Sequence, residues 1–136
     1  MILVDTSVWV DFLRRKGSEA VKDRVSALLS SREACCTCPV SFELELGARS
    51  PAELRAIEVV LGVCPFIPLE KRHWVVASGL GRSLRTAGAA VPHGDLLVAA
   101  VALEEPCAVL TLDRHFIQIR QKAAPKLEVE LLEGSK

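Results

Sequence analysis

The chain has 136 residues, of which half are hydrophobic and a quarter are charged. This length suits one domain that buries its own core without disulfides or structural metals. Lysine plus arginine and aspartate plus glutamate number 17 each, so the formal net charge is zero. A zero net charge excludes nucleic-acid binders that depend on an overall positive field, and any such contact needs a local basic patch.

The N-terminal sequence does not resemble a secretion signal, because Asp5 interrupts the apolar run and no small-residue cleavage site follows. No apolar stretch of the sequence approaches the roughly 18–20 residues needed to cross a bilayer. We therefore expect a cytoplasmic protein with no membrane association.

The chain contains five cysteines, and Cys35 and Cys38 form a C-x-x-C motif. A structural zinc site needs a second pair at similar spacing, but Cys64 and Cys107 stand alone. A redox pair needs a motif that opens a helix after a strand, which Cys38-Pro39 allows. Within a strand, residues three apart point to opposite faces. We favour buried thiols in a strand and keep a thiol oxidoreductase as an alternative.

Short apolar runs alternate with amphipathic stretches in the first half of the chain. The pattern predicts a strand at residues 2–4, a helix at 6–15 that Gly17 ends, a helix from Ser18, a strand at 34–37 and a helix from Pro39 to about Gly47.

The same alternation continues in the second half. Ser50, Pro51 and Glu53 form a helix start with an N-cap, a proline at the first position and a capping box. The pattern predicts helices at residues 50–62, 70–86, 95–103 and 113–119, and strands at 64–69, 108–110 and 127–132. This order favours an α/β domain over residues 1–132 with a mainly parallel sheet and helices on both faces, and a polar tail at 133–136.

Four acids stand at positions where they can meet. Asp5 ends the first strand, and Asp113 follows the strand at 108–110. In open α/β sheets, ligands bind at the C-terminal ends of the strands. Glu43 lies in the helix after the second strand and Asp95 opens the apolar helix, so both can point to that edge.

Taken singly, Asp5, Asp95 and Asp113 are each also explained as helix N-caps. However, Glu43 and Asp95 lie in apolar segments, and no lysine or arginine is near Asp95 in sequence. Buried acids need a partner, and clustered carboxylates favour Mg²⁺ or Mn²⁺. The sequence lacks glycine-rich phosphate loops, which favours metal-assisted hydrolysis of a phosphodiester over nucleotide binding.

Four segments in this order are recognisable together: MILVDTSVW at the N-terminus, Glu43-Leu-x-x-Gly47-Ala-Arg, Gly94-Asp95-Leu-Leu-Val-Ala-Ala, and Leu110-Thr111-x-Asp113-x-His-Phe116. The chain thereby resembles PIN-domain ribonucleases, in particular the VapC-like toxins of toxin–antitoxin pairs. The resemblance implies a three-layer α/β/α sandwich, an endoribonuclease that depends on Mg²⁺ or Mn²⁺, a cognate antitoxin and a homodimer.

The resemblance also assigns roles to residues. It implies catalytic roles for Asp5, Glu43, Asp95 and Asp113, with Asp5, Asp95 and Asp113 as metal ligands and Thr6, Ser7 and Thr111 in support. A PIN-like module that binds RNA or protein without cleaving is the alternative, although all four acids are present. For the homodimer, the apolar helical surface at residues 21–62 is a candidate interface.

Further residues have two interpretations each. Arg82 and Arg85 lie on one helical face and Arg114 follows Asp113, so they can contact RNA phosphates or simply face solvent. We assign His93 and His115 packing or capping roles. Trp9 and Trp74 can stack on bases, but both fall on apolar helical faces and are interpreted first as core or interface residues.

Overall fold

The structure is a computed structural model that describes residues 1–133. Residues 134–136, which belong to the predicted polar tail, lie outside the described residues. Within 1–133, no helix has both the length and the apolar character that crossing a membrane requires.

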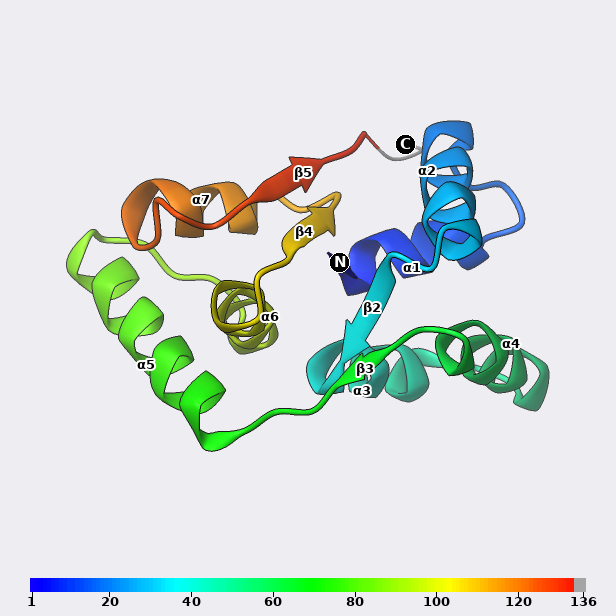
Figure 1. The fold of residues 1–136 in the computed structure, drawn as a ribbon, viewed down its shortest axis with the longest axis horizontal. Coiled ribbons are helices and arrows are strands. Elements are labelled where there is room, and N and C mark those ends of the chain that lie inside the picture. Colours follow the sequence, from blue (N-terminus) through cyan, green and yellow to red (C-terminus); the bar gives the residue numbers. More distant parts are fainter. Residues whose placement is uncertain (134–136) are drawn as a thin grey trace.

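Five parallel strands form the centre of the molecule, in the order β3-β2-β1-β4-β5 (Figure 1). The strands are β1 (Ile2–Val4), β2 (Ala34–Thr37), β3 (Phe66–Ile67), β4 (Ala108–Thr111) and β5 (Val129–Leu131). β1 is the central strand, with Leu3 opposite Cys35 on one side and Val109 on the other. These three residues are fully buried, as expected for a strand that is covered on both faces.

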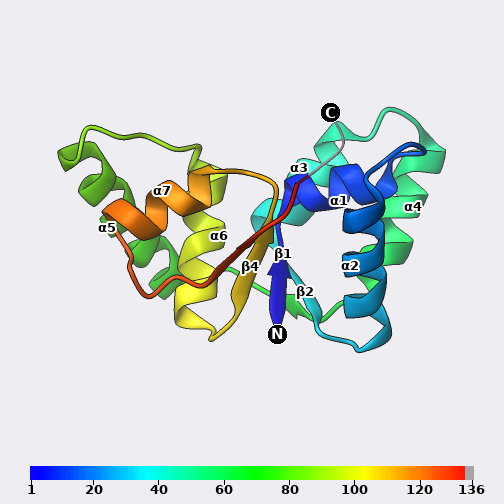
Figure 2. The ribbon, with the colours of Figure 1, turned by 90° about the horizontal axis from the view of Figure 1, so that it is seen from above.

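Seven helices cover the sheet in the described part of the chain. They are α1 (Thr6–Leu13), α2 (Glu19–Ser30), α3 (Cys38–Gly47), α4 (Pro51–Gly62), α5 (Lys71–Thr86), α6 (His93–Glu104) and α7 (His115–Lys122). Figure 2 shows α5, α6 and α7 on one side of the strands, and α1, α2 and α4 on the other. The predicted three-layer α/β/α sandwich with a parallel sheet is therefore confirmed.

Two predicted helix starts were wrong, and both concern site acids. α6 begins at His93, because the carbonyl of Pro92 already accepts from the backbone N–H groups of Asp95 (3.1 Å) and Leu96 (3.3 Å). α7 begins at His115, because the backbone N–H of Asp113 is bound by the Thr111 hydroxyl at 2.9 Å in a local turn. Asp95 is therefore the third residue of its helix, and Asp113 precedes its own.

The serine caps follow the prediction more closely. Ser18 Oγ accepts from the backbone N–H of Val21 at 3.5 Å, and Ser50 Oγ accepts from that of Glu53 at 3.1 Å. The Glu53 carboxylate accepts from the backbone N–H of Arg49 at 2.7 Å, one residue before the position that a capping box requires. The helix start is correct, but the second half of the predicted box is displaced by one residue.

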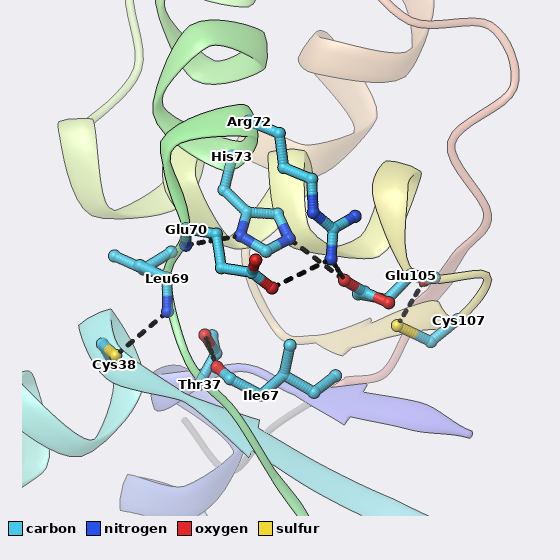
Figure 3. Close-up of polar contacts among 9 residues, drawn as sticks. All are labelled: Thr37, Cys38, Ile67, Leu69, Glu70, Arg72, His73, Glu105 and Cys107. Carbon is cyan, nitrogen blue, oxygen red and sulfur yellow. Dashed lines mark hydrogen bonds and ion pairs between the residues drawn. The ribbon is translucent and has the colours of Figure 1, made fainter.

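A polar network fixes the start of α5 against the end of α6 (Figure 3). His73 is fully buried, and its Nδ1 accepts from the backbone N–H of Glu70 at 2.9 Å. Its Nε2 therefore carries the proton and faces the Glu105 carboxylate at 3.3 Å. Arg72 contacts both Glu70 and Glu105, and its hydrogen bonds are the main reason that the pKa of Glu105 is lowered.

Candidate active site

The first site acid is held by two hydroxyl groups. Asp5 follows β1 and is only 2% exposed. Its Oδ2 accepts from Ser7 Oγ at 2.7 Å and from Thr111 Oγ1 at 2.9 Å. Although Asp5 occupies the N-cap position of α1, its side chain makes no capping hydrogen bond. The interpretation of Asp5 as an ordinary helix cap is therefore wrong.

The same hydroxyls also bind the chain that leaves β4. Ser7 Oγ accepts from the backbone N–H of Leu112 at 3.1 Å, and Thr111 Oγ1 accepts from that of Asp113 at 2.9 Å. Each hydroxyl thus donates to Asp5 and accepts from the loop that carries Asp113. The C-terminal ends of β1 and β4 are joined, and Asp5 and Asp113 lie at the same sheet edge.

A second group of side chains lies beside this pair. Asp95, on α6, is 8% exposed, and its Oδ2 is 2.9 Å from Nδ1 of His115. The same nitrogen is 3.3 Å from Oδ1 of Asp113. Asp95, Asp113 and His115 each offer one ligand atom, and these atoms lie within 4.8 Å of one another.

Burial and mutual repulsion disfavour the charged forms of these acids. Burial, and then the charge of Asp5, raise the pKa of Asp95 to about 7, against a smaller lowering by the hydrogen bond from His115. Burial also raises the pKa of Asp5, and the hydrogen bonds from Ser7 and Thr111 only partly offset it. The charge of Asp113 adds to the rise at both residues. A bound cation would remove this repulsion.

Glu43 lies at the edge of the site and is more exposed. Its Oε1 accepts from the Thr6 hydroxyl at 3.1 Å. A Cβ added to Gly94 would lie 3.2 Å from the same oxygen, so the glycine beside Asp95 leaves room for this carboxylate. Burial, and to a lesser extent the charge of Asp5, raise the pKa of Glu43. Its neighbour Glu45 is exposed.

The structure thus brings together all the residues for which the resemblance implies catalytic or supporting roles. It adds His115, for which we predicted only a packing or capping role. The only sequence signal for a role of His115 in the site was its position two residues after Asp113. A histidine in the first turn of a helix has many uses, however, and its contact with Asp95 depends on packing across 20 residues of sequence.

The other predicted contact residues lie on α5, on α1 and just before α7. Arg82 and Arg85 line a groove between α5 and α6, as does Trp74, which is 53% exposed. Arg114 is exposed just before α7. Trp9 is fully buried, with its ring edge-on to Phe12 at a centroid distance of 6.0 Å, so it is a core residue and cannot stack on a base.

The C-x-x-C motif does not form a paired thiol site. Cys35 lies in β2 with its thiol 3.4 Å from the carbonyl of Ile2, whereas Cys38 opens α3 and its sulfur accepts from the backbone N–H of Leu69 (Figure 3). A hydrogen bond with Cys107, together with burial, raises the pKa of the Cys35 thiol. A raised pKa makes a thiol inert, so the contacts oppose the thiol oxidoreductase alternative.

The donor set fits a divalent cation. Carboxylate oxygens that converge within a few ångströms are ligands of Mg²⁺ and Mn²⁺. The sequence predicted oxygen ligands only, and the structure adds an imidazole nitrogen to the group. Asp5 provides further negative charge next to it.

The parallel sheet between two helical layers, with acids gathered beyond its central strands, agrees with the domain that the sequence motifs predicted. A sequence profile of the PIN domain family matches residues 2–122, a range that contains every residue of the site. The chain belongs to the PIN-domain family.

Among similar curated proteins, the ribonuclease VapC11 of Mycobacterium tuberculosis (strain ATCC 25618 / H37Rv) is 32% identical over 121 residues. The match covers 85% of this chain and 89% of that protein. The VapC ribonuclease Mb1587 of Mycobacterium bovis matches to the same extent. The predicted resemblance to VapC-like proteins is confirmed.

Solved structures agree on the fold. VapBC2 from Rickettsia felis, bound to a DNA fragment from its promoter, superposes with a TM-score of 0.79 at 18% identity, covering 98% of this chain and 100% of that chain. FitAcB from Neisseria gonorrhoeae superposes with a TM-score of 0.78 at 20% identity, covering 95% of this chain and 96% of that chain.

Proposed function

We propose that this chain is an endoribonuclease that depends on Mg²⁺ or Mn²⁺ and acts as the toxin of a toxin–antitoxin pair. The observation that carries the proposal is the convergence of Asp5, Asp95 and Asp113 at the C-terminal ends of β1 and β4. The raised pKa values of Asp5 and Asp95 are typical of a cation site, and so is the close approach of ligand atoms from Asp95, Asp113 and His115. Similarity to proteins named VapC ribonucleases supports RNA as the substrate.

Each residue then has a defined task. Asp5, Asp95 and Asp113 would hold the cation, which would supply positive charge for the phosphoryl group and lower the pKa of a water molecule. Ser7 and Thr111 fix the orientation of Asp5 through their hydrogen bonds. His115 fixes Asp95. Glu43, which Thr6 holds in place, completes the cation's surroundings or orients the attacking water.

The first test is RNA cleavage with and without Mg²⁺ or Mn²⁺, for the wild type and for Asp5→Asn. We expect cleavage only with the metal, and no cleavage above background by Asp5→Asn, because the amide removes a charged ligand and keeps the shape. Growth inhibition on expression should be lost with it. Circular dichroism should show an intact fold.

Asp23→Asn is a matched control, because Asp23 is exposed on α2, and it should cleave like the wild type. An Asp5→Asn protein that cleaves RNA at the wild-type rate would overturn the proposal. A wild type that binds Mn²⁺ and RNA but never cleaves would instead favour the PIN-like module without catalysis.

Partners are part of the same proposal. Solved structures with this fold include a toxin-antitoxin complex from Klebsiella pneumoniae and a member of the VapBC family of toxin-antitoxin systems from Mycobacterium tuberculosis, which supports a cognate antitoxin for this chain. An antitoxin-like reading frame immediately upstream of the gene would strengthen this assignment. We also propose a homodimer, and a cytoplasmic location, where RNA is available to a nuclease.

A further inference from the structure

A groove runs between α5 and α6, and none of the four site acids lines it. Its volume is about 430 Å³, which suits a small ligand or part of a polymer. α5 and α6 are in contact and lie next to each other in both ribbon views (Figures 1 and 2). The segment between them, residues 87–92, closes one end with Ala89, Ala90 and Val91.

One wall of the groove is a stripe of α5. Trp74, Ser78, Arg82 and Arg85 follow one another at helical spacing and all line the groove. Just over half of the Trp74 side chain is exposed, and the two arginines are exposed as well. The arginines and His93 are the basic lining residues, and none of the described residues that line the groove is acidic.

The floor of the groove is apolar and closely packed. A Cβ at Gly81 would lie 3.3 Å from Cδ1 of Leu96, so α5 packs closely on α6 at this point. Leu96 and Leu97 face the groove from α6. The contact of His73 with Glu105 joins the start of α5 to the residue that follows α6.

The first turn of α6 separates the groove from the active site. His93 lines the groove, Gly94 adjoins the Glu43 carboxylate, and Asp95 faces His115 and the other acids. His93 and Asp95 are two residues apart and point about 200° apart around α6, so RNA bound at both places has to pass around this first turn. The acids repel a polyanion and the net charge of the chain is zero, so a nearby source of positive charge is required.

We propose that this groove binds the single-stranded RNA next to the cleaved phosphodiester, a proposal that rests on the proposed function. The indole of Trp74 stacks on a base, and Arg82 and Arg85 pair with phosphates. Both kinds of contact tolerate any sequence, so the groove contributes affinity and register and does not read bases.

Intrinsic fluorescence provides a direct test, because the chain has only two tryptophans and Trp9 is fully buried. A pool of ten-nucleotide RNAs of mixed sequence is titrated into the Asp5→Asn protein, which keeps the RNA intact. We expect quenching of the exposed Trp74. The quenching should disappear in a Trp74→Phe background.

Affinity for the same RNA pool is then measured by filter binding. Trp74→Ala should weaken binding about tenfold, the amount expected for one lost stacking contact, whereas Trp74→Phe should retain most of it. Arg82→Ala and Arg85→Ala should each lower the slope of log K against log salt by about 0.7, the amount expected for one lost phosphate contact. Arg55→Ala removes an exposed arginine from α4 and should leave the slope unchanged.

In the cleaving background, the groove substitutions should raise KM for RNA and leave kcat near the wild-type value. If affinity and salt slope do not change, the groove assignment is wrong while the proposed function stands. If the wild type neither binds nor cleaves RNA, the proposed function itself fails. If Trp74→Ala converts a dimer into a monomer in sedimentation analysis, a second copy of the chain covers the groove and the proposal is overturned.

Discussion

Thr111 connects Asp5 with the loop that carries Asp113 in the candidate site. It is fully buried at the end of β4, donates to Asp5 and accepts from the backbone N–H of Asp113. Its removal would leave a buried carboxylate and a backbone N–H group without this partner. One side chain thus orients both acids.

We expect Thr111→Val to lower RNA cleavage by about 10- to 100-fold, the usual effect of losing a group that orients a metal ligand. The free energy of unfolding should fall by about 1–3 kcal/mol, because valine keeps the shape but not the hydrogen bonds. Single-turnover cleavage and urea unfolding measure the two effects. Thr111→Ser should restore most of the activity, and Thr86→Val, on the exposed end of α5, should change neither quantity.

Asp95 makes the stability of the metal-free protein depend on pH. Its pKa is raised from 3.8 to about 7 in the folded protein, so between these values the folded state keeps a proton that the unfolded state releases. The contribution of Asp95 to the free energy of unfolding is therefore fully present below about pH 4, and this contribution is lost as the pH rises through 7.

The corresponding measurement is thermal unfolding in EDTA from pH 4 to pH 8, for the wild type and for Asp95→Asn. We expect the Tm of the wild type to fall relative to that of Asp95→Asn as the pH rises, because the amide has no charge to bury. A Tm difference that does not change with pH would contradict the raised pKa.

Among single residues, the sequence predicted the acids of the site far better than the side chains that contact them. Asp5, Asp95 and Asp113 stood at the ends of recognisable elements in a parallel fold, so topology alone brings them to one edge. The partners of Asp95 could not be predicted in this way. The His115 contact depends on the relative rotation of α6 and α7, which no local pattern encodes.

At the scale of elements, the turn between α1 and α2 depends on a close approach of the backbone at Gly17. Asp11 is buried, and its Oδ1 accepts from the backbone N–H of Ser18 at 2.8 Å. A Cβ added to Gly17 would lie 2.1 Å from the carbonyl oxygen of Asp11, closer than any real contact. Only glycine fits at this point.

Gly17→Ala should therefore lower the free energy of unfolding by about 1–3 kcal/mol, because the backbone must move to admit the methyl group. Gly62→Ala is the matched control, since a Cβ there meets nothing within 4 Å and alanine favours a helix. Urea unfolding distinguishes the two variants. Equal stability of Gly17→Ala and the wild type would show that the turn relaxes at no cost.

Element types were predictable because the hydrophobic periods of strands and helices differ. Boundaries were less predictable. The Thr111 side chain binds a backbone N–H group before α7, whereas the backbone carbonyl of Pro92 accepts the first hydrogen bonds of α6 and so moves its start forward. The strand predicted at 64–69 is reduced to Phe66–Ile67 at the sheet edge. Its apolar composition gave no indication that only two residues pair.

For the whole molecule, cation binding and folding are linked, because the acids of the site converge only when β1, β4 and α6 are packed together. An ion that binds the folded chain but not the unfolded one adds to stability. Protons compete for the same carboxylates, so this gain should be larger at pH 8 than at pH 5.

With Mn²⁺ at one hundred times its Kd, we expect Tm to rise by roughly 10 °C at pH 8, and EDTA to reverse the rise. Scanning calorimetry measures the shift. The double variant Asp95→Asn, Asp113→Asn should show no shift, and KCl at equal ionic strength serves as the salt control. An equal shift for wild type and double variant would place the ion elsewhere.

The sheet order has a consequence for how the protein is made. β1 is synthesised first but lies at the centre of the sheet, and Asp5 is held by a hydroxyl 106 residues further along the chain. A nascent chain that has not yet reached β4 carries Asp5 and Glu43 but neither Thr111 nor Asp113. The proposed nuclease is thus silent throughout most of its own translation, and a product truncated before β4 is harmless to RNA.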